Sequence, residues 1–127
     1  MTSLRDVEAL IVAYLDPLLA PKVSTRIPNP RPVELVRVQR IDNTRQNIVQ
    51  ERPLVLIECW GASSVSAFAL ASQVWGLLDA LDDTTAQDAW FHAAELSSPV
   101  NQPDPSTASP RYQFTASMVV HLTKEPA

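Results

Sequence analysis

The residues of this chain that could perform nucleophilic chemistry gather at the end of one apolar segment, residues 54–60. Cys59 lies near the end of that segment, and Ser63 and Ser64 follow the glycine at position 61. Many catalytic nucleophiles occupy the tight turn between a strand and a helix. Here, however, the second glycine of a Gly-x-Ser-x-Gly elbow is missing, and no motif places a histidine or an acid beside the serines. We therefore predict that Cys59 is a buried structural cysteine and that the chain is not an enzyme.

Metal, phosphate and nucleic-acid chemistry have equally little support in the sequence. His92 and His121 fall on different expected strands, and no cysteine or carboxylate spacing joins them into a ligand set. The chain has two glycines in total, too few for a phosphate-binding loop. The arginine-rich zone at 26–52 lacks interleaved aromatic residues, and the net charge is −4. We expect no metal, no cofactor and no sequence-specific nucleic acid partner. One enzymatic or ligand-binding alternative stays open, with a site near Cys59, Ser63 and His92.

The segment 54–81 contains the two elements around which we expect the rest of the chain to pack. Residues 54–60 form an apolar run that predicts a buried strand, bounded by Pro53 and Gly61. A helix follows, with Ser63 or Ser64 capping its first free amides. The helical spacing of large and small apolar residues predicts one buried stripe, made of Phe68, Ala71, Val74, Trp75, Leu78 and Leu81.

The residues before this segment predict one helix and two strands. Ser3 and Asp6 form a capping-box pattern ahead of an amphipathic helix, which Pro17 and Pro21 end. Residues 23–27 alternate as a short strand does, and 33–41 predict a longer one. Since neither face of 33–41 is wholly apolar, we expect it at an edge or an interface. Residues 42–51 then form an exposed hairpin tip, with antiparallel pairing of the flanking strands.

The residues after the central helix predict two more strands. An acidic connection leads to residues 89–96, whose apolar residues would also suit a helix but whose length and place before a loop favour a strand. A long exposed loop at 97–110 and a strongly alternating strand at 111–122 follow. We therefore predict a single α+β domain over residues 1–127, in the order α-β-β-β-α-β-β. Its antiparallel sheet has four to five strands, and both helices pack on one face. No apolar run is long enough to span a membrane, and the lone cysteine favours a reducing compartment such as the cytoplasm.

Charge is distributed unevenly along the chain. Residues 1–52 hold eight Lys and Arg against six acids, whereas residues 53–110 hold seven acids and no base. If these zones lie on different faces, one subunit can dock on the next and the contact can close into a ring. Solvated surface charge is the alternative interpretation. The candidate contact residues are Arg26, Arg37, Arg40, Arg45, Arg52, Asp79, Asp82, Asp83 and Asp88.

The order of these patterns resembles the tail terminator proteins of long, non-contractile-tailed bacteriophages. The resemblance is carried by the opening helix LRDVEALIVAYLDPLL, the proline-broken VSTRIPNPRP, the central RPLVLIECWGASSVSAFALASQVWGLLDAL and the late RYQFTASMVVHL. These segments cover almost the whole chain. Small neck proteins of the same phages share much of the pattern, so another head-tail joining protein is the alternative within the virion.

The resemblance implies a non-enzymatic virion protein that is assembled in the host cytoplasm. Such a protein forms a ring, hexameric in this family, on the head-proximal end of the tail tube. It stops polymerisation of the major tail protein and presents a surface to the head-tail connector, with DNA only passing through its channel. The expected loops 42–51 and 97–110 then become candidates for contact with the tube or the connector, or for lining the channel.

Overall fold

The computed structural model describes residues 6–45, 50–82, 84–86 and 89–122. These residues form an α+β fold, as the sequence predicts. Its elements, in chain order, are α1 (Val7–Leu15), η1 (Asp16–Leu18), β1 (Lys22–Ser24), β2 (Leu35–Arg45), β3 (Gln50–Trp60), α2 (Ser64–Asp79), β4 (Thr84–Ala86), β5 (Ala89–Leu96), β6 (Val100–Asn101) and β7 (Arg111–Leu122).

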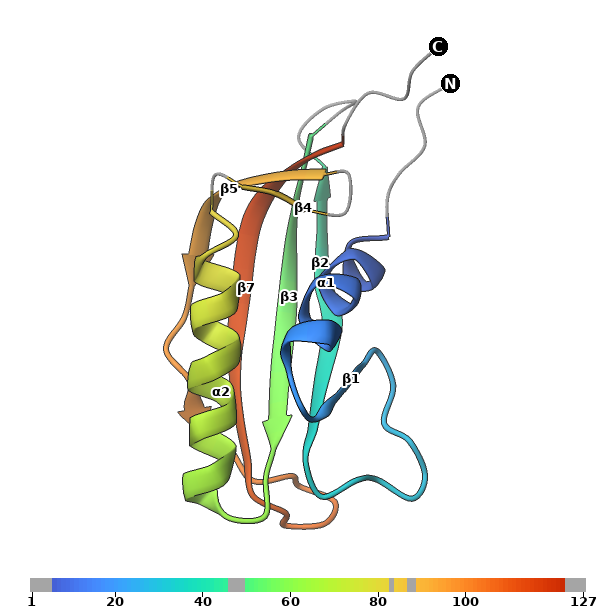
Figure 1. Ribbon diagram of the computed structural model, residues 1–127, viewed down its shortest axis with the longest axis vertical. Coiled ribbons are helices and arrows are strands. Elements are labelled where there is room, and N and C mark those ends of the chain that lie inside the picture. Colours follow the sequence, from blue (N-terminus) through green and yellow to red (C-terminus); the bar gives the residue numbers. More distant parts are fainter. Residues whose placement is uncertain (1–5, 46–49, 83, 87–88, 123–127) are drawn as a thin grey trace.

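The strands build one mixed sheet in the order β1-β2-β3-β7-β5-β4, and β6 pairs with β7 beside this path. The described sheet thus has seven strands rather than four or five. β4 and β6 are the additional strands, and both are very short. The sheet is also not purely antiparallel, because β1 pairs with β2 in parallel. The connection 25–34 makes this possible, since it carries the chain from the end of β1 back to the start of β2 (Figure 1).

Both helices cover the same face of the sheet (Figure 1). α1 packs over β2, and α2 packs over β7 and β3. The two helices meet where the hydroxyl of Tyr14 donates to the carbonyl of Leu77 at 2.9 Å. Alternation along the strands turns Ile57 and Phe114 toward the helices, where they join a single hydrophobic cluster. Cys59 lies in this cluster, completely buried, which confirms the prediction that it is a buried cysteine.

Local sequence explains where the helices begin. The Ser63 side chain accepts the backbone N–H of Ser66, and the Ser66 hydroxyl accepts the backbone N–H of Ser63, so of the two predicted serines it is Ser63 that caps the helix. Gly61 is required just before it, because a Cβ there would lie 2.5 Å from the backbone nitrogen of Ala67. α1 is capped by Asp6, whose carboxylate accepts the N–H of Ala9 at 3.0 Å. Ser3, the other half of the predicted capping box, lies outside the described residues.

The buried stripe of α2 is displaced from the predicted one. Its buried residues are Ala67, Leu70, Ala71, Val74 and Leu78. Phe68 was expected inside, but 48% of its surface is exposed. It lies about 100° around the helix from Ala67, and small alanines at positions 67 and 71 let the helix approach the sheet closely. The Phe68 ring instead packs edge to face on Tyr112, with ring centroids 5.2 Å apart.

Strand pairing also corrects the expected loops. The hairpin of β2 and β3 reaches Arg45 and Gln50, so most of the expected tip at 42–51 is strand, and residues 46–49 lie outside the description. Pro53 does not bound β3 but lies inside it, opposite Asn43, just beyond a bulge in β2. β2 itself lies between β1 and β3 rather than at an edge.

The expected loop at 97–110 is partly ordered by pairing and burial. Its residues Val100 and Asn101 form β6 along β7. Asp104 is buried rather than exposed. The strands predicted at 89–96 and 111–122 are confirmed as β5 and β7, with β5 carrying a bulge between His92 and Glu95.

Candidate interaction surface

A buried tryptophan fastens three loops together at one end of the sheet. Trp60 ends β3 and alternates with Cys59, so its ring lies on the face opposite the helices. Its Nε1 donates to Oδ2 of Asp104 at 3.2 Å, and the guanidinium carbons of Arg31 and Arg111 lie 5.5 and 5.6 Å from its ring centroid. Both arginines are within range of cation–π attraction. The loops 25–34 and 102–110, at the lower end of Figure 1, are thus both held to Trp60, and the N–H of Gly61 in the next loop donates to the carbonyl of Pro110 at 3.3 Å.

A buried carboxylate next to Trp60 is neutralised by two arginines. Glu58 is only 2% exposed, and its two oxygens are paired separately. Oε1 lies 2.6 Å from Nη2 of Arg37 on β2, and Oε2 lies 2.7 Å from Nη1 of Arg111 on β7. A buried charge requires such partners. Arg37 was a candidate for subunit contact, and the structure gives it this intramolecular role.

Asp104 organises the turn that precedes β7. Its Oδ1 accepts the backbone N–H and the hydroxyl of Ser106, both at 2.9 Å, while its carbonyl accepts the N–H of Ala108. The Ser106 backbone N–H is the main reason that the pKa of Asp104 lies below its usual value, and bonds from the Ser106 hydroxyl and Trp60 add to it. The buried side chain of Asp104 therefore holds the turn in place, while Ser106 and Ala108 are exposed.

The other predicted basic residues are spread over several elements. Arg52 pairs across the sheet with Glu95 at 3.2 Å. The backbone N–H of Arg40 donates to Oε2 of Glu8 at 2.7 Å, which ties β2 to α1. Arg26 is exposed, two residues past the end of β1. The side chain of Arg45 is not among those described.

The predicted acidic residues lie toward the other edge of the sheet. Asp79 ends α2 and is exposed. Asp82 precedes β4 and accepts the backbone N–H of Ala94 at 3.2 Å. Asp83 and Asp88 lie outside the described residues. The charge asymmetry of the sequence thus places Arg26 beside the β1 edge, and Asp79 and Asp82 beside the β4 edge.

Carboxylates satisfy backbone donors along the outer strands. Asp82 accepts a backbone N–H from β5, and Glu8 accepts one from β2. In the same way, Oδ1 of Asp16 accepts the N–H of Val23 on β1 at 3.3 Å. Unsatisfied edge donors invite pairing with another sheet, and side chains that occupy them oppose it. At Val23, Arg40 and Ala94 the backbone N–H groups are therefore already occupied and do not invite another strand.

The outward face of α2 carries no charge until its last residue. The chain from position 59 to 78 contains no Asp, Glu, Lys or Arg. The exposed residues of the helix include Val65, Phe68, Ala69, Ser72, Gln73 and Gly76, and Val65 is 78% exposed. A solvated helix normally carries charged residues on its outer face. The sequence shows this surface as an uncharged stretch, and of its apolar residues only Phe68 belongs to the stripe that the helical spacing predicts to be buried.

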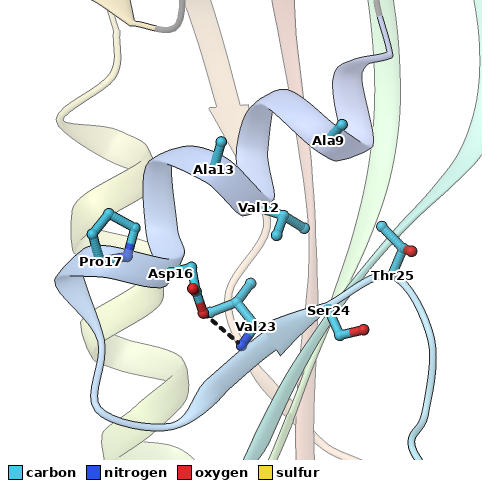
Figure 2. Close-up of a pocket in the computed structure, with 8 residues that line it drawn as sticks. All are labelled: Ala9, Val12, Ala13, Asp16, Pro17, Val23, Ser24 and Thr25. Carbon is cyan, nitrogen blue, oxygen red and sulfur yellow. Dashed lines mark hydrogen bonds between the residues drawn. The ribbon is translucent and has the colours of Figure 1, made fainter.

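A hollow lies at the opposite edge of the sheet, between α1 and β1. Its volume is about 430 Å³, and Figure 2 shows the small and apolar side chains around it. It is lined by Ala9, Val12, Ala13, Asp16, Pro17, Val23, Ser24 and Thr25. The exposed side chains of Lys22 and Arg26 flank this stretch of β1. Sequence analysis gave no indication of the hollow, because it depends on how the two elements pack.

The residues proposed for nucleophilic chemistry do not come together. Cys59 faces the helix-covered core, and its burial raises the pKa of the thiol, with the charge of Glu58 adding to the effect. Ser63 is committed to capping α2. His92 lies on the open face of the sheet, stacked on Trp90 with ring centroids 4.2 Å apart. Across the part of the chain that the structure describes, no three His, Cys, Asp or Glu residues are grouped as metal ligands.

No known protein family or curated protein identifies this chain, which matches no protein-family model and no curated protein sequence. Within the described residues, no helix has both the length and the apolar character needed to cross a membrane.

Proposed function

We propose that this chain is a structural protein of a long-tailed phage virion that forms a ring at the head-proximal end of the tail tube. The ring, a hexamer by resemblance to tail terminators, stops polymerisation of the major tail protein. It then joins the tail to the head-tail connector. DNA passes through its channel without being read, and the protein performs no catalysis.

The observation that carries this proposal is the amount of large apolar surface left exposed. Val65 and Phe68 are exposed one turn apart on the uncharged face of α2, while Val33 and Val100 are exposed on other elements. Exposed apolar patches are typical of surfaces that another protein covers. The order of sequence patterns shared with tail terminators supports the same proposal, as do the oppositely charged edges, because a head-to-tail contact between different surfaces generates a ring when its rotation closes.

Electron microscopy of particles assembled without the protein tests this proposal. We expect tail tubes longer than those of the wild type, because nothing then stops polymerisation of the major tail protein. Supplying the protein in trans should restore the normal length, which controls for indirect effects of the deletion. Normal-length tails that fail to join heads would instead favour the neck-protein alternative. Particles with normal tails joined to heads would refute both.

A further inference from the structure

The outward face of α2 has the composition of a contact surface, and among the described residues only the ring of Tyr112, which packs on Phe68, is seen to cover part of it. Phe68 and Val65 project from its first turns, and no charged residue accompanies them. Burying these side chains against a partner would remove apolar area from water, which favours association. Asp79, at the end of the helix, has no side-chain partner among the described residues.

Gly76 adds an independent indication on the same face. It is exposed in the interior of α2, and a Cβ built there would meet nothing within 4 Å. A glycine inside a helix costs about 1 kcal/mol relative to alanine. No neighbour in the described chain requires this glycine, and its missing side chain leaves the helix backbone open to close approach by another molecule.

The hollow between α1 and β1 offers a matching surface at the other edge of the sheet. Its lining is small and largely apolar, like the face of α2. Lys22 and Arg26 have no side-chain partners within the described part of the chain, and both are exposed, directly before and after the lining residues Val23, Ser24 and Thr25. Of the nearby acids, Asp16 is engaged with the N–H of Val23, and Glu34 is not among the lining residues.

We propose that the outward face of α2 packs into the α1–β1 hollow of a second copy of this chain, with Asp79 facing Lys22 and Arg26 of that copy. The inference rests on the proposed ring and assigns its subunit contact. The two surfaces differ and lie toward opposite edges of one sheet, so each copy uses both, as a closed ring requires. Because carboxylates occupy the N–H groups of Val23 and Ala94, the contact is made by side chains.

Substitution of Gly76 separates this interface from a merely structural role. Gly76→Ala should make the isolated chain more resistant to denaturant, because it improves helix propensity without a clash. The same substitution should weaken ring assembly about tenfold, measured by sedimentation of the full chain with and without tail tubes. Gln39→Ala, at an exposed position on β2, is the matched control and should leave assembly unchanged. Gly76→Ala rings as stable as those of the wild type would overturn the inference.

Exchange of charges tests the partner surface. Asp79→Lys and Lys22→Asp should each weaken assembly, while the double variant Asp79→Lys with Lys22→Asp should recover much of the loss, because the attraction across the contact is restored with its sign reversed. Equal losses that simply add would contradict the pairing. If the Gly76, Asp79 and Lys22 variants all form rings as the wild type does, the assigned contact is wrong but the proposal that the chain forms a ring still holds. A wild-type chain that stays monomeric on tail tubes would refute the ring and the contact together.

Discussion

The charge of Glu58 should be among the largest single contributions to the stability of this fold. Glu58→Gln keeps the shape of the side chain but leaves two guanidinium groups without their counter-charge, and its amide turns a donor toward one of them. Breaking a buried ion pair by removing one partner costs about 3–5 kcal/mol. The side chains of Arg37 and Arg111 are 24% and 12% exposed, so water recovers part of that cost. We expect a loss of about 2–4 kcal/mol in the free energy of unfolding.

Denaturant titration followed by tryptophan fluorescence measures this loss, because Arg111, one of the two partners of Glu58, lies over the Trp60 ring. Glu95→Gln is the matched control: it makes the same chemical change in the pair with Arg52, where the glutamate side chain is 78% exposed. An exposed pair contributes about 0–1 kcal/mol. If the two variants lose equal stability, or if Glu58→Gln loses less than about 0.5 kcal/mol, the reasoning that burial sets the strength of this network is wrong.

Three further predictions concern local structure. Asp104→Asn should destabilise the protein at neutral pH. Because the pKa of Asp104 is lower in the folded protein than in the unfolded chain, where it is about 3.9, its ionised form stabilises the fold above that pH. The difference in the free energy of unfolding between wild type and variant should therefore vanish as the pH falls below about 3.9. A difference that does not change with pH would contradict this. Gly61→Ala should cost about 1–3 kcal/mol, measured by thermal unfolding, because its Cβ would press on the backbone of Ala67; an unchanged melting temperature would refute the close approach. Ser63→Ala should cost about 1 kcal/mol through loss of the α2 cap, and Ser63→Asp should retain most of the stability in the same assay.

The parts of the fold that depend on local pattern could be predicted from the sequence. β7 alternates over its length, and the capping residue of α2 is Ser63, one of the two serines predicted, because both signals reside in neighbouring residues. β4 and β6 could not be found in this way. Strands of two or three residues are fixed by the strand they pair with, and their own sequences carry no alternation.

The candidate contact residues show the same limit. The residues next to Arg37 in the sequence indicate only a solvated side chain. Its partner Glu58 lies 21 positions away and is brought to it by the register of β2 on β3. Arg111 joins the same carboxylate from 53 positions away. Phe68 shows the converse, since helical periodicity alone cannot say which of two adjacent apolar stripes faces the sheet.

The central claim is that this chain acts as a ring that ends a tube. Polymerising the purified major tail protein with and without the chain, and measuring tube lengths by electron microscopy, tests it most directly. We predict tubes that become shorter as the concentration of the chain rises, each with an added ring at one end. Tubes of unchanged length with bare ends, over a range of concentrations of the chain, would contradict the claim.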